Sequence, residues 1–302
     1  AVSRIDEAGL NINQYGNRNL IINGAMQVAQ RGTTFSLTGN GYGQYTLDRW
    51  AAYYNYTEVA QLNAVIDGQY KNYVKISGNV SNNPTNLFFY QKIESGSKLL
   101  SGKTFTLSFL AKSSNNTAVR IRGRFYDSAA ETNSVASTIS SSISLTSDWT
   151  KYTVTHTATD SSANMTRDFF LLFDNVGGSF SSGDDFWLTE IQLEVGDTAT
   201  DFEHRTFGDE LARCQRYYFN SDEADSFIQA FDVTSGNAYY FTIMNPTTMR
   251  TGPTITLSNE SNSNFDGITV FRNYATRWSG YDTATGSGRG YWQFEYEADA
   301  EL

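Results

Sequence analysis

The sequence predicts an all-β protein, in which an antiparallel β-sandwich is followed by one short helix and a small C-terminal β-domain. Many short segments alternate apolar and polar residues, as strands with one buried face do. Stretches rich in Gly, Ser, Thr and Asn separate these segments, and such stretches are typical of turns. Helical periodicity is almost absent outside residues 208–218, so we expect a single helix there.

Composition excludes several classes of protein. The chain has 302 residues, enough for two domains, and its formal net charge is −10. Because phosphate binding needs a basic surface, we expect no nucleic-acid partner. No apolar run approaches the roughly 20 residues that span a bilayer, so we expect no membrane insertion. The single cysteine, Cys214, excludes an intrachain disulfide and a cysteine-rich zinc site.

The order of these signals divides the chain into three regions. Residues 1–18 are polar and weakly patterned, and we expect an arm that attaches the chain to another protein. Residues 19–205 hold the predicted sandwich. Residues 206–302 hold the helix and the C-terminal β-domain, which is short for an independent core and rich in aromatic residues. We therefore expect this last domain to complete its core against partner chains.

The sandwich strands are predicted from their alternation. Residues 103–113, 118–126 and 149–158 each place apolar side chains on one face. Residues 168–174 form a nearly continuous apolar run, as expected of a strand covered on both faces. Four further side chains are expected in the core of this domain: Trp50, Trp149, Trp187 and His156.

Three arginines share the polar face of one predicted strand: Arg120, Arg122 and Arg124. Guanidinium groups bind carboxylates with two parallel hydrogen bonds, so this row could hold an acidic glycan. A solvated face, or a row of ion pairs between subunits, is the interpretation that we favour.

The helix is predicted from local chemistry. Asp209 and Glu210 place negative charge at its N-terminal end, where the helix dipole favours it. Leu211, Cys214 and Tyr218 recur at spacings of three and four residues and form one apolar face. The helix is either a simple connector or a surface that packs against symmetry copies of itself.

The segment 277–290 is the candidate ligand site. It is rich in Gly, Ser and Thr, so we expect a loop, and loops on a rigid scaffold often carry binding residues. Trp278 and Tyr281 could stack on sugar rings, although core packing is an equal alternative for both. The polar partners expected for sugar hydroxyls are Arg277, Asp282 and Arg289. Trp292 lies in a well-alternating segment and is expected in the core.

Several motifs, in one order along the chain, resemble those of tail-fibre and receptor-binding proteins of tailed bacteriophages. They are NLIINGAMQVAQRGT at residues 19–33, YTLDRW at 45–50, QLEVG at 192–196, ATDFEHR at 199–205, ELARCQRYY at 210–218, MRTGPTIT at 249–256 and ADAEL at 298–302. Residues 20–194 further resemble the jelly rolls of carbohydrate-binding modules, so the sandwich is expected to be a jelly roll.

This resemblance implies a function and a set of partners. The implied protein lies in the virion, at a tail fibre or tail tip, and adheres to a glycan on a bacterial host. It implies a homotrimer whose N-terminal arm joins an upstream tail or baseplate protein. The chain would then end far from the particle, so we expect the C-terminal domain to contact the receptor.

Related jelly rolls often place a calcium-ligating Asp where Glu190 stands. Calcium needs six to eight oxygen ligands, and no second ligand can be identified in the sequence. We therefore favour a surface or interface carboxylate and expect no metal or cofactor.

Two other functions remain open: a structural or connector protein of the virion without a ligand, and a glycan depolymerase. The sequence has only two histidines and no Gly-x-Ser-x-Gly or His-Glu-x-x-His motif, so we expect no catalytic residues.

Overall fold

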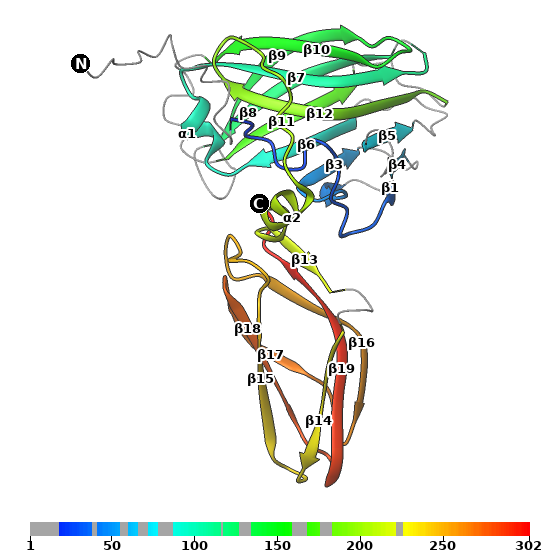
Figure 1. The fold of residues 1–302 in the computed structure, drawn as a ribbon, viewed down its shortest axis with the longest axis vertical. Coiled ribbons are helices and arrows are strands. Elements are labelled where there is room, and N and C mark those ends of the chain that lie inside the picture. Colours follow the sequence, from blue (N-terminus) through cyan, green and yellow to red (C-terminus); the bar gives the residue numbers. More distant parts are fainter. Residues whose placement is uncertain are drawn as a thin grey trace, which may run out of the picture. The chain divides into compact units, whose positions relative to one another are not determined.

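The computed structural model describes residues 18–37, 41–54, 60–65, 72–77, 87–115, 117–126, 134–158, 168–175, 183–221 and 226–302. All but the last residue of the predicted N-terminal arm lies outside these ranges. The chain divides into two compact units, residues Ala1–Thr206 and Phe207–Leu302. Figure 1 shows both units as mostly strands, and the all-β prediction is confirmed. No helix in the described part of the chain is long and apolar enough to cross a membrane.

Unit 1 contains two six-stranded antiparallel sheets (Figure 1). Sheet A has the order β1 (Thr34–Leu37), β4 (Ala60–Val65), β5 (Tyr73–Ser77), β12 (Asp185–Val195), β7 (Thr104–Ser113) and β10 (Thr150–Thr157). Sheet B has the order β2 (Gly41–Tyr45), β3 (Trp50–Tyr54), β6 (Leu87–Ile93), β11 (Phe169–Asn175), β8 (Ala118–Tyr126) and β9 (Ser134–Ser144). Strands far apart in sequence are neighbours in both sheets, which gives the expected jelly roll. A five-residue helix, α1 (Gly96–Leu100), was not predicted.

The core of unit 1 follows from the predicted alternation. Phe105, Leu107 and Phe109 of β7 are almost fully buried in it. Trp50 lies there as expected, stacked on Phe89 with 4.7 Å between ring centroids. Its indole Nε1 donates to the Asn23 carbonyl at 3.0 Å, so the buried polar group is satisfied.

The motif after β12 ties the first described residues of the chain to this sandwich. The Arg205 guanidinium donates to the carbonyls of Ile21 at 3.0 Å and of Asn19 at 2.6 Å. The Asn19 amide in turn donates to the Glu203 carboxylate at 2.8 Å. These motif residues therefore hold the fold together.

Unit 2 begins with helix α2 (Phe207–Gln215), on which Cys214 of the predicted apolar face is buried. Sheet C joins β13 (Tyr218–Asn220), β19 (Gly288–Asp299), β14 (Phe227–Val233) and β16 (Thr254–Ser263), and sheet D has the order β15 (Ala238–Met244), β18 (Arg277–Thr283) and β17 (Thr269–Tyr274). Trp278, Trp292 and Phe294 are almost fully buried in a core to which both sheets contribute. Unit 2 thus has a hydrophobic core of its own.

Two predictions need correction. The expected loop at 277–290 is mostly strand, because β18 and β19 leave only residues 284–287 between them. Trp149 and Trp187 are not core residues but half-buried on the outer face of sheet A. Phe186 and Leu188 point inward from β12, so alternation turns Trp187 outward.

Candidate functional site

Sheet D of unit 2 exposes a concentration of large apolar side chains. In the described part of the chain eight such side chains are exposed, and four of them lie on the strands of sheet D. They are Tyr240 at 66%, Met244 at 63%, Tyr274 at 50% and Phe271 at 43% exposure. Scattered exposed apolar residues are ordinary, whereas a cluster on one sheet face indicates a binding surface.

Three of the aromatic rings on this face contact one another. Tyr240 stacks on Tyr281 with centroids 5.4 Å apart and an interplanar angle of 30°. Phe271 meets Tyr240 edge-on at 5.9 Å and Tyr281 at 5.7 Å. We call Tyr240, Phe271, Tyr274 and Tyr281 the aromatic patch.

Strand register explains how the patch forms. Tyr240 on β15 is directly opposite Tyr281 on β18, so their side chains share a face. Between β17 and β18 the register shifts: Val270 pairs with Gly280 and Arg272 pairs with Ser279, which leaves Phe271 without a partner. This bulge allows Phe271 to face outward beside Tyr281.

Cations and hydroxyls border the patch. The Arg272 guanidinium lies 5.3 Å from the Phe271 ring centroid, and that of Arg277 lies 5.6 Å from the Tyr274 ring centroid. The hydroxyls of Thr242 and Ser279 are 2.9 Å apart on the same face. Flat rings with adjacent donors suit a ligand that has one apolar face and many hydroxyls, as a sugar ring has.

The structure separates the residues predicted for the ligand site. Arg277 and Tyr281 lie on this outer face, Arg277 exposed and Tyr281 half-buried. The expected stacking role of Trp278 is wrong, because its ring is fully buried, 5.5 Å from Phe241 and 5.1 Å from Tyr296. Alternation along β18 turns it inward, and Trp292 is buried as expected.

The other two predicted residues lie away from the patch. Asp282 is buried, and its carboxylate accepts hydrogen bonds from the amides of Gly267 at 3.0 Å and Thr283 at 2.7 Å. It fixes the backbone and offers nothing to a ligand. Arg289 is exposed on sheet C, opposite Asp232 of β14. The five predicted residues therefore do not form one site.

Sequence reasoning missed Tyr240, Phe271 and Tyr274. One signal was present for Phe271, because two apolar residues in succession, Val270 and Phe271, break the alternation of a strand with one buried face. Such a break indicates either a bulge or a second apolar face.

The arginine row of unit 1 forms an ion-pair network within the chain. The Arg120 Nε and the Arg122 Nη2 each lie 2.8 Å from the Asp174 Oδ2. Burial raises the pKa of the Asp174 carboxyl and lowers the pKa of the Arg122 guanidinium. Arg120 and Arg122 thus pair with a carboxylate of their own chain and do not form a purely solvated face.

The aromatic side chains beside that network are closed to ligands in this structure. Phe170 lies 4.5 Å from Tyr126 and 5.8 Å from Tyr90, measured between centroids, and these three rings are only 4–7% exposed. Phe169, Leu171 and Phe173 point to the opposite side, into the main core. The prediction that this strand is covered on both faces is confirmed.

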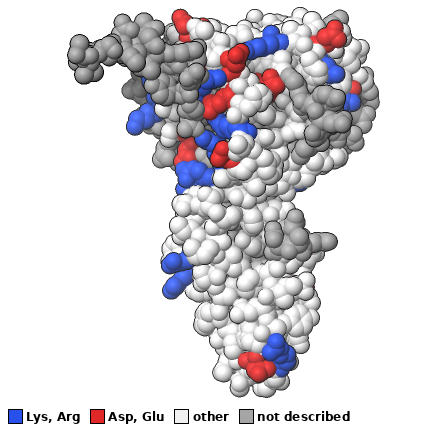
Figure 2. Space-filling model, viewed as in Figure 1, with Lys and Arg blue, Asp and Glu red and all other residues white. Residues whose placement is uncertain are grey.

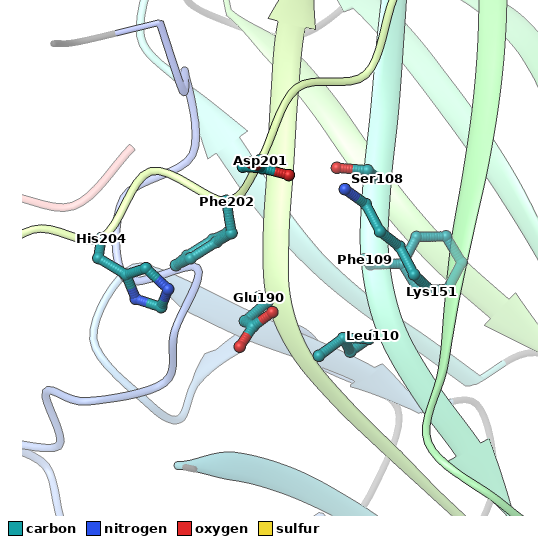
Figure 3. A pocket seen from close by; sticks show the side chains of 8 residues that line it. All are labelled: Ser108, Phe109, Leu110, Lys151, Glu190, Asp201, Phe202 and His204. Atoms are coloured by element: carbon teal, nitrogen blue, oxygen red, sulfur yellow. The ribbon is translucent and has the colours of Figure 1, made fainter. Parts of the chain in front are cut away.

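Glu190 lies at a pocket of unit 1. It has a φ of 49° at the irregularity between Thr189 and Gln192 of β12. Figure 3 shows its carboxylate between Phe202 and Leu110 at the wall of a pocket of about 280 Å³. Among the described residues, no group of three or more His, Cys, Asp or Glu side chains could hold a metal ion.

No protein-family model matches the chain, and no curated protein matches it. Among solved structures, the enzymatically active domain of tailspike protein 4 of bacteriophage CBA120 matches over 59% of this chain and 22% of its own, with 17% identity and a TM-score of 0.41. The chain thus spans about a fifth of that protein's length.

Two further similar structures contain carbohydrate-binding modules. The CBM22-1–GH10 modules of Clostridium thermocellum xylanase 10B match over 61% of this chain and 30% of theirs, with 14% identity and a TM-score of 0.38. The CBM22-1 xylan-binding domain of Paenibacillus barcinonensis Xyn10C matches over 55% of this chain and 98% of its own, with 11% identity and a TM-score of 0.32. Identities and TM-scores this low assign neither a family nor a function.

Proposed function

We propose that this chain is a non-enzymatic adhesion subunit of a bacteriophage tail fibre or tail tip, and that it binds a glycan on the surface of a bacterial host. The observation that carries the proposal is the exposed aromatic patch on sheet D. The ordered motifs from residue 19 to the C-terminus supply its biological setting, because they resemble those of tail-fibre proteins.

The patch has the chemistry that weak glycan binding needs. One stacked ring and a few hydrogen bonds supply about −4 kcal/mol, which corresponds to millimolar affinity. A homotrimer would present three patches, and linked weak sites add up to useful avidity. The N-terminal arm would attach the trimer to an upstream tail or baseplate protein and leave unit 2 free to meet the host.

Adsorption to host cells tests the proposal. Replacing Tyr240→Ala and Tyr281→Ala together removes the stacked pair, and we expect adsorption to fall about tenfold or more. Ile228→Ala is the matched control, because Ile228 is 64% exposed on β14 of sheet C, outside the patch. Both variants should keep the oligomeric state of the parent and should unfold as cooperatively as the parent, with at most a small decrease in melting temperature. A folded double variant that adsorbs like the parent would place the receptor site elsewhere.

The exposed Met244 favours one alternative, a connector protein whose sheet D is covered by another virion protein or by another copy of the chain. In that case the parent would bind no host glycan, and the double variant would change assembly alone. An activity assay distinguishes a glycan depolymerase from a non-enzymatic subunit. When the pure protein is incubated with host capsule or lipopolysaccharide, we expect no release of reducing ends.

A further inference from the structure

The outer face of sheet A carries a row of alternating lysine and tryptophan side chains across four neighbouring strands. Trp187 of β12 is paired with Lys75 of β5 on one side and with Lys112 of β7 on the other. Trp149 immediately precedes Thr150 of β10, which pairs with Ala111 of β7, so Trp149 lies beside Lys112. We call Lys75, Trp187, Lys112 and Trp149 the Trp–Lys row.

Distances show that the row is one connected surface. The Lys112 ammonium lies 4.9 Å from the Trp187 ring centroid and 5.3 Å from that of Trp149. The Lys75 ammonium lies 5.5 Å from the Trp187 ring centroid. All four side chains are half-buried, so their stems are fixed while part of each remains accessible.

The two lysines differ in their partners. Lys75 forms an ion pair of 2.9 Å with Asp185. Lys112 has neither an ion pair nor a hydrogen bond to the part of the chain that the structure describes, and its contacts there are with the two indoles. An ammonium between two aromatic side chains can bind a carboxylate while an indole contacts the ring that bears it.

A pocket begins next to this row. Leu110 lies two residues before Lys112, and Lys151 lies two residues after Trp149, so both share the outer face with the row. They line the 280 Å³ pocket of Figure 3, together with Ser108, Glu190 and Asp201. Its volume is close to the lower end of ligand sites, about 300 Å³, which suits a single sugar residue.

The charges on the pocket wall restrict what can enter. Glu190 and Asp201 present carboxylates, which repel a second acidic sugar and accept hydrogen bonds from hydroxyls. The Lys151 ammonium already donates to the Thr200 carbonyl at 3.1 Å. An uncharged sugar therefore fits the pocket, and an acidic sugar fits the Trp–Lys row.

We propose that the outer face of sheet A is a second glycan-binding site, and that it takes an acidic oligosaccharide in which a carboxylate-bearing sugar adjoins a neutral one. The carboxylate of the acidic sugar pairs with the Lys112 ammonium, and the ring of that sugar contacts Trp187 or Trp149. The neutral sugar lies at the pocket. This site is in unit 1 and does not depend on the aromatic patch of unit 2.

Binding of defined tetrasaccharides to the full chain tests this site. Unsulfated hyaluronan and chondroitin tetrasaccharides alternate glucuronate with a neutral, N-acetylated amino sugar. The fully N-acetylated chitotetraose, hereafter chitotetraose, is the uncharged comparison. We expect at least one alternating probe to bind, at concentrations up to about 10 mM, more tightly than chitotetraose. Lys112→Gln should weaken this binding about tenfold, and added salt should weaken it as well.

Matched variants make the outcome decisive. Lys98→Gln changes an exposed lysine on α1, away from the row, and should bind like the parent. The Tyr240→Ala/Tyr281→Ala variant should also bind like the parent, which separates this site from the aromatic patch. The proposal is overturned if no alternating probe binds, if chitotetraose binds equally well, or if Lys112→Gln binds like the parent while keeping its melting temperature.

Discussion

At the scale of single residues, burial distinguishes Trp278 from Tyr281, three positions further along β18. The Trp278 ring contacts Phe241 and Tyr296 in the core of unit 2, whereas Tyr281 forms part of the outer aromatic patch. We expect Trp278→Ala to lower the free energy of unfolding by about 3–5 kcal/mol and Tyr281→Ala to lower it by no more than about 1 kcal/mol. Urea unfolding measures both values, and equal losses would contradict the assignment.

His156 predicts a pH dependence of stability. Its ring points inward, 2.7 Å from the Ser137 hydroxyl and 5.4 Å from the Phe105 ring, and burial lowers its pKa below the usual 6.5. The unfolded chain therefore binds the proton more readily, so this contribution to stability is complete above pH 6.5 and is lost as the pH falls. Thermal melts between about pH 5 and 7 should show a smaller decline for His156→Gln than for the parent.

At the scale of elements, the first described residues are built against β12. A Cβ added to Gly24 would clash with the Ile191 carbonyl oxygen, so Gly24→Ala must displace backbone. We expect it to cost about 1–3 kcal/mol of unfolding free energy. Gly208→Ala in α2 meets nothing within 4 Å and should be neutral or slightly stabilising. A Gly24→Ala variant with the melting temperature of the parent would show that stability does not depend on the close approach of Gly24 to Ile191.

Alternation was enough to predict β7, β8 and β10, because each of these strands is long enough to show a period of two. A nearly continuous apolar run predicted β11. Helix α1 has five residues, too few for a helical period to appear. The sequence does not reveal the outward position of Trp187, because a large aromatic residue between two apolar neighbours is typical of a core. The aromatic patch was missed because it depends on a bulge and on pairing between three strands, and a single strand's sequence contains neither.

At the scale of the whole molecule, we predict a homotrimer. The resemblance to fibre proteins motivates it, and so does Phe207 at the start of α2, which is 56% exposed. Closed cyclic assembly covers such a side chain. Light scattering should give about three times the chain mass of 33.7 kDa, and Phe207→Ser should weaken the assembly. A stable monomer at micromolar concentration would refute the trimer.

Figure 2 shows positive and negative side chains interspersed over unit 1. The visible face of unit 2 carries few charged side chains. The contacts proposed for the aromatic patch are ring stacking and hydrogen bonds to uncharged hydroxyls, also where Arg272 and Arg277 border it, so its affinity should respond weakly to salt. The Trp–Lys row should respond strongly, because its proposed contact is ionic. We therefore expect glycan binding by unit 2 to persist at salt concentrations that abolish binding at Lys112.

The most direct measurement of the central claim is an array of bacterial surface polysaccharides probed with the full chain, the Tyr240→Ala/Tyr281→Ala variant and the Ile228→Ala control. We predict that the parent and the control retain the same glycan and that the double variant loses it about tenfold or more, with at most a small decrease in melting temperature. Retention of that glycan by the folded double variant at the parent's level would contradict the claim that the aromatic patch binds it.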